Sequence, residues 1–157
     1  CITSELTTTK LPNLLMSNTC VINYSVPVSL NFDTELFVNY LCTSLTITNS
    51  FFEFTFVSVP AICDMHRVQL NDASETDIIT FNLTEAPLST LSGLIGDIYI
   101  CPDIANHHAR ELNHSLDIEI QTLITHGILH ILGYDDQNVA DKKLMFAKQD
   151  HLVANYQ

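Results

Sequence analysis

Positive charge is scarce in this chain of 157 residues. Lysine and arginine together number 6 against 18 aspartates and glutamates, which gives a formal net charge of −12. Because a globally acidic surface repels nucleic acid, any contact with RNA has to come from a local basic patch. The excess of carboxylates favours solubility and also offers oxygen ligands to metal ions. Five of the six basic residues are Arg67, Arg110, Lys142, Lys143 and Lys148.

Long apolar runs and paired cysteines are missing as well. No stretch reaches the roughly 18 consecutive apolar residues of a membrane span, so we expect no membrane contact. The first residues lack the basic region, apolar run and cleavage site of a secretory signal. The five cysteines form no C-x-x-C pair, which favours reduced thiols over a disulfide framework or a zinc ribbon. We therefore expect a cytoplasmic protein.

Short apolar runs alternate with helical patterns along the chain, which is long enough for one domain with its own core. The runs that predict strands are residues 19–30, 51–59, 75–83 and 94–100. The patterns that predict helices are residues 33–47, 61–70, a stretch after Pro102, 115–132 and 138–154. We expect a single α+β domain over residues 19–157, with a four-stranded mixed sheet packed by about five helices. Residues 1–18 form an N-terminal extension whose part in the fold stays open.

The longest helical pattern, residues 115–132, carries apolar side chains on nearly all faces, as a central buried helix does. Ser115 is placed to cap its start, and Gly133 is placed to end it in a left-handed conformation. His126 and His130 then lie in its final turns.

The last helical pattern begins after Asn138, a residue suited to the N-cap position. Its lysines are expected to face water while an apolar set packs inward. That set is Val139, Met145, Leu152 and Val153.

The stretch "HGILHILGYDD" (126–136) has the spacing of a metal site. His126 and His130 share one helix face, and a chain reversal at Gly133 lets Asp136 fold back as a third ligand. Three protein ligands leave one position for water, which is the catalytic pattern for zinc. Asp135 is a competing ligand if the turn differs by one residue. The alternative is a buried helix with two satisfied core histidines.

Metal-dependent peptidases with the H-E-x-x-H motif carry a glutamate general base directly after the first histidine. Gly127 occupies that position here, so a peptidase mechanism lacks its proton acceptor. A glycine instead allows a close approach of substrate or neighbouring backbone.

The same stretch resembles the H-G-x-L-H-L-x-G-Y-D-H signature of the YbeY endoribonuclease family, which are bacterial rRNA maturation factors. Further segments are similar in the same order: "TDIITF" (76–81), "LIGDIYI" (94–100) and "NHSLDIEIQTLITHG" (113–127). The resemblance runs from about Thr19 to the C-terminus.

This resemblance implies a small α+β domain with one zinc ion in a cleft. It also implies metal-dependent cleavage of single-stranded RNA during rRNA maturation and ribosome quality control, with RNA and the ribosome or ribosomal proteins as partners. His126 and His130 match the first two family ligands, and Asp136 replaces the third histidine. A carboxylate binds zinc at about 2.0–2.2 Å, but its negative charge makes a harder cation such as Mn²⁺ an alternative.

Other residues are candidates for supporting roles. Asp97 in "LIGDIYI" is a candidate catalytic residue that orients a ligand histidine. Arg67, Lys142 and Lys143 are candidates for substrate binding, because they supply much of the positive charge. His107, His108, His114 and His151 have no ligand spacing with the main pair. His107 and His108 are expected to be ordinary surface residues unless the fold brings them in.

Two family arginines are replaced, by Leu70 and by Ile118. These losses, the acidic charge and Asp136 support a rival interpretation, a weakly active or inactive ribosome-associated factor with the same fold. A metallopeptidase is the third possibility and is disfavoured by Gly127.

Overall fold

A computed structural model of the chain describes residues 17–72, 74–85 and 91–157, and it confirms the predicted α+β domain. Of the predicted extension, residues 1–18, positions 1–16 lie outside the described residues. The strands are β1 (Thr19–Tyr24), β2 (Phe51–Phe56), β3 (Ile78–Asn82) and β4 (Ile95–Ile100). The helices are α1 (Thr34–Ser44), α2 (Val59–Leu70), α3 (Pro102–Glu111), α4 (Leu116–Ile131) and α5 (Val139–Tyr156). None of the described helices is long and apolar enough to cross a membrane.

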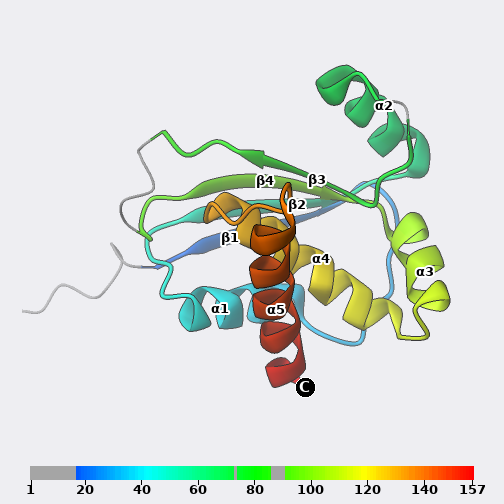
Figure 1. The fold of residues 1–157 in the computed structure, drawn as a ribbon. Coiled ribbons are helices and arrows are strands. Elements are labelled where there is room, and N and C mark those ends of the chain that lie inside the picture. Colours follow the sequence, from blue (N-terminus) through cyan, green and yellow to red (C-terminus); the bar gives the residue numbers. More distant parts are fainter. Residues whose placement is uncertain (1–16, 73, 86–90) are drawn as a thin grey trace, which may run out of the picture.

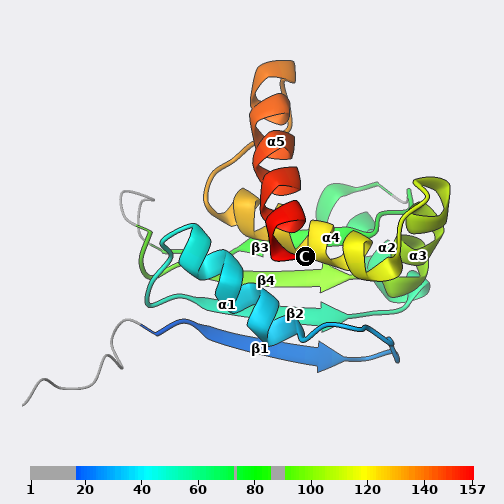
Figure 2. The same ribbon diagram turned by 90° about the horizontal axis from the view of Figure 1, so that it is seen from below.

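The sheet is mixed, as predicted, with strand order β1-β2-β4-β3. Strands β1, β2 and β4 are parallel, and β3 pairs with β4 in the antiparallel sense at the sheet edge. Helices α1, α4 and α5 cover one face, as Figures 1 and 2 show. Side chains alternate across a strand, so Phe52, Phe54 and Phe56 of β2 are fully buried on the helix side.

Helix α4 is the central buried helix that the sequence predicts. The Ser115 hydroxyl accepts a hydrogen bond from the Ile118 amide at 3.2 Å, and Gly133 follows the helix with a φ of 97°. The helix lies close to the sheet at two glycines. A Cβ at Gly96 would lie 2.1 Å from Ile131 Cδ1, and one at Gly127 would lie 3.2 Å from Ile98 Cδ1.

The predicted strands are longer than the observed ones, and one residue that was expected to pack inward is exposed. The first predicted strand ends at Tyr24 because the chain after it turns toward α1. In α5, Met145, Leu152 and Val153 are buried as predicted, but Val139 is 86% exposed. Val139 is the first residue of a helix whose first turns project past the β3 edge, beyond the core (Figure 2).

The side chains of Met145 and Val139 should therefore contribute very differently to the stability of the fold. We expect Met145→Ala to lower the free energy of unfolding by about 2–5 kcal/mol, because it removes a fully buried side chain. The matched variant Val139→Ala should change it by no more than about 0.5 kcal/mol. Urea unfolding in the presence of a chelator measures both, and equal losses would contradict the placement of α5.

Candidate metal centre

The two histidines of α4 meet at their Nε2 atoms. The spacing of four residues puts His126 and His130 on one face of the helix, and their Nε2 atoms lie 2.9 Å apart. Two imidazole nitrogens at this distance need either a shared proton or a shared cation between them, because two facing lone pairs repel each other.

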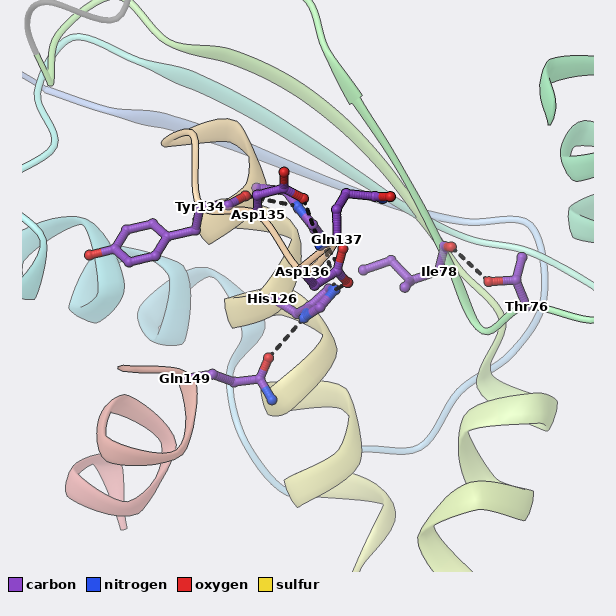
Figure 3. Close-up of polar contacts among 9 residues, drawn as sticks. Thr76, Ile78, His126, Tyr134, Asp135, Asp136, Gln137 and Gln149 are labelled. Carbon is purple, nitrogen blue, oxygen red and sulfur yellow. Dashed lines mark hydrogen bonds and ion pairs between the residues drawn. The ribbon is translucent and has the colours of Figure 1, made fainter. Parts of the chain in front are cut away.

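Asp136 completes the group from the loop after α4. Its Oδ2 lies 3.7 Å from His126 Nε2 and 3.6 Å from His130 Nε2. A point equidistant from these three atoms lies about 2.0 Å from each, which is the bond length of zinc to nitrogen and oxygen ligands. Figure 3 shows Asp136 pointing toward His126. The competing ligand, Asp135, instead accepts a hydrogen bond from the Gln137 amide at 3.0 Å.

Each imidazole is oriented by a hydrogen bond at its other nitrogen. The Oε1 atom of Gln149, on α5, lies 2.9 Å from His126 Nδ1. The backbone carbonyl oxygen of Tyr134 lies 3.1 Å from His130 Nδ1. A carbonyl can only accept, so His130 Nδ1 carries the proton and its Nε2 is left with a lone pair. Such partners are typical of histidine ligands.

The electrostatics favour the neutral form of His126. Burial, together with the neighbouring His130, lowers the pKa of His126, while Gln149 and the Asp136 carboxylate oppose that shift. Neutral imidazole is the form that binds a metal, because a protonated nitrogen has no lone pair.

The three residues open onto a cavity of about 770 Å³, here called the site cavity. Its other walls come from the end of α2 and from β3, including Leu70, Thr80 and Asn82. A second cavity of about 620 Å³, here called the α5 cavity, lies between α4 and α5. His126 and Asp77 line both cavities, so the two adjoin at the candidate ligands.

A family model described as "Endoribonuclease YbeY" matches residues 29–157. The chain belongs to the YbeY family. Curated YbeY relatives include the endoribonuclease YbeY of Staphylococcus carnosus, 41% identical over 107 residues, covering 65% of this chain and 69% of the relative. That of Beutenbergia cavernae is 34% identical over 108 residues, covering 64% and 71%. The solution structure of a Thermotoga maritima protein matches with a TM-score of 0.55 at 27% identity, covering 86% and 87%.

The predicted supporting residues are not all brought to this candidate site. Asp97 follows Gly96 on β4 and precedes Ile98, which packs against α4, so alternation turns the Asp97 side chain to the opposite face. Burial there raises its pKa, and its neighbours are Tyr99 and Glu53. Asp97 therefore does not orient a ligand histidine, and Gln149 and the Tyr134 carbonyl occupy that role.

The predicted basic residues differ in whether they reach the candidate site. Arg67 pairs with the exposed Asp64 at 2.9 Å and does not line the site cavity. Lys142 lies over the ring of Phe146, 5.4 Å from its centroid, and that ring stacks on His126 at 5.9 Å. Lys143 is exposed on the same helix.

Two histidines outside the main pair meet carboxylates beside the cavities. His108 Nδ1 lies 2.9 Å from Asp77 Oδ2, and His114 Nε2 contacts Glu119, a buried residue of α4. Spacing rules find ligands only within one element. His108 of α3 meets Asp77 from the chain before β3, and only the fold reveals this contact. His114 lies between α3 and α4, five residues before its partner Glu119.

Gln149 offers a test of histidine orientation. We expect Gln149→Leu to weaken metal binding by about 10–100-fold, because His126 loses the acceptor that fixes its Nδ1 proton. The control is Gln121→Leu, since Gln121 is buried on α4 and, among the described residues, its side chain bonds only with Gln157. Competition titration with a chromophoric chelator measures both affinities. Equal weakening in the two variants would contradict the orienting role.

The His108–Asp77 pair predicts a pH dependence of the metal-free protein. The hydrogen bond to Asp77 raises the pKa of His108, so the folded state holds this proton more tightly than the unfolded chain. The resulting stabilisation is fully present below the unfolded pKa of about 6.5 and is lost as pH rises through the folded value.

We therefore expect the difference in unfolding free energy between wild type and His108→Gln to shrink from about pH 5.5 to about pH 8.5. Chemical denaturation in chelator measures it. His107→Gln is the control, because the His107 side chain is 73% exposed and pairs with the exposed Glu111. If the difference for His108→Gln grew with pH, the pKa of His108 would be lowered by folding and not raised, which would contradict the prediction.

Proposed function

We propose that this chain is a zinc-dependent endoribonuclease that cleaves single-stranded RNA in the cytoplasm. Its substrate would be precursor rRNA, its partners the ribosome or ribosomal proteins, and its role rRNA maturation and ribosome quality control. The observation that carries the proposal is the meeting of His126, His130 and Asp136 at the wall of the site cavity. Membership in the YbeY family, whose curated relatives are named as endoribonucleases, supports RNA as the substrate.

The donor set suits a catalytic divalent cation. Two imidazoles and one carboxylate leave at least one coordination position open, and Zn²⁺ or Mn²⁺ accepts these ligands. A bound cation supplies Lewis acidity, which polarises a phosphate oxygen and lowers the pKa of a bound water. The chain itself holds His126 and His130 in the required orientation through Gln149 and the Tyr134 carbonyl.

The α5 cavity offers contacts for an unpaired base. Phe146 lines it beside His126, and an aromatic ring can stack on any base regardless of sequence. Lys142 lies over the same ring and can approach a neighbouring phosphate. These features support a preference for single strands, whose bases are free to leave the stack.

A peptidase fits the geometry less well. A Cβ at Gly127 would meet Ile98, Thr80 and Ile78, all of which belong to the sheet. A side chain at this position therefore enters the helix–sheet interface, and the peptidase base has no place beside the first histidine.

The third ligand is the sharpest test of the proposal. Asp136→Ala should lose one metal equivalent relative to wild type and reduce cleavage of single-stranded RNA by more than about 100-fold, beyond the effect of removing an orienting partner. Asp135→Ala is the matched control, since its carboxylate accepts a hydrogen bond from the Gln137 amide within the turn. Elemental analysis and a cleavage assay on the same samples provide both readouts.

His130→Ala should behave as Asp136→Ala does. Metal binding by the wild type without RNA cleavage would replace the proposal with the rival interpretation of an inactive ribosome-associated factor. Chelator-resistant cleavage would remove the metal from the mechanism.

A further inference from the structure

The structure contains a second group of potential ligands in the same region. We propose that Asp77, His108 and Glu119 bind a second divalent cation, beside the site formed by His126, His130 and Asp136. The cation site itself does not depend on the proposed RNA hydrolysis. Its suggested role, contacting an RNA phosphate, does rest on that function.

Three separate elements bring this group together. Asp77 precedes β3, His108 lies on α3 and Glu119 lies in the first turn of α4. One potential ligand atom from each residue lies within 4.8 Å of the other two, and His108 Nδ1 lies 2.9 Å from Asp77 Oδ2. Small side-chain rotations would bring such atoms to the bond lengths of about 2.0–2.2 Å that Zn²⁺ requires.

The charge balance of the group points to a cation. The Glu119 side chain is only 7% exposed and that of Asp77 only 18%, so both carboxylates are largely removed from water. Among the described residues, no lysine or arginine lies within 4.0 Å of either one, and their ion-pair partners are His108 and His114. Buried carboxylates need a compensating positive charge. Without a metal, a protonated His108 supplies one positive charge for the two carboxylates, whereas a divalent cation would balance both.

The fourth residue, His114, has a supporting position. Its Nε2 contacts Glu119 Oε2 and so fixes the orientation of that carboxylate. A group of two carboxylates and one imidazole, with one carboxylate held from outside, suits Zn²⁺ or Mn²⁺. Three protein ligands would leave coordination positions for water or for a phosphate oxygen.

The location gives the second cation a use. Asp77 lines both cavities together with His126, and its charge acts on the His126 imidazole. Among the described residues, neither cavity is lined by any lysine or arginine. In a chain of net charge −12, a bound divalent cation would supply the positive charge that an RNA phosphate needs inside this region.

The test is metal stoichiometry, because it reads out binding without requiring catalysis. The full chain is stripped with a chelator and titrated with Mn²⁺ and, separately, with Zn²⁺ by isothermal calorimetry. We expect two equivalents for wild type, one for His108→Ala, one for His130→Ala and none for the double variant. His107→Ala is the matched control, since it removes the adjacent histidine of α3 from an exposed pair with Glu111, and it should retain two.

A second variant guards against an effect of folding. Asp77→Asn keeps the shape of the side chain, and circular dichroism in chelator checks that each variant folds. A single equivalent in wild type that is lost in His130→Ala but unchanged in His108→Ala and Asp77→Asn overturns the second site. Equal loss in His107→Ala and His108→Ala also overturns it.

The outcomes separate this inference from the proposed function. One cation with RNA cleavage would remove the second site and leave the nuclease. Two cations without RNA cleavage would keep the second site and remove the nuclease. With both present, His108→Ala should weaken RNA binding at least 10-fold, while His107→Ala should leave it unchanged.

Discussion

The close packing of α4 on the sheet is the constraint on which the candidate site depends. Gly96 on β4 and Gly127 on α4 allow the helix to lie nearer the strands than a Cβ at either position would permit. At this depth the helix buries Ile124 and Ile128, while its other side presents His126 and His130 to the cavities. Since Thr80 of β3 touches the helix at Gly127, the sheet edge becomes the opposite wall of the site cavity. Helix depth therefore determines the cavity as well as the core.

The sequence predicts a feature correctly where the residues that determine it lie within one helix, strand or turn. The predicted N-cap residues Ser115 and Asn138 both accept hydrogen bonds from the first turns of their helices. The histidine pair was found because its spacing matches the helical period. The length of the turn favours Asp136 over Asp135 as the third ligand, and the Asp136 carboxylate lies beside both imidazoles.

Features that depend on tertiary arrangement could not be predicted in this way. Asp97 lies on a predicted strand, but which face of that strand meets the histidine helix follows from sheet packing. Val139 fits the apolar pattern of α5, yet the position of the helix relative to the sheet edge exposes it. The pair of His108 with Asp77 joins α3 to the chain before β3. No periodicity within one segment encodes such contacts.

The turn at Gly133 couples the end of a helix to the candidate metal centre. Its positive φ lets the chain reverse, so that the Tyr134 carbonyl reaches His130 and Asp136 reaches both imidazoles. One turn thus provides a ligand and an orienting group together. Fraying of this helix end and release of a bound cation would be a single thermodynamic event, and each would report on the other. The free concentration of the metal would then set how often the last turn of α4 opens, through ordinary binding linkage.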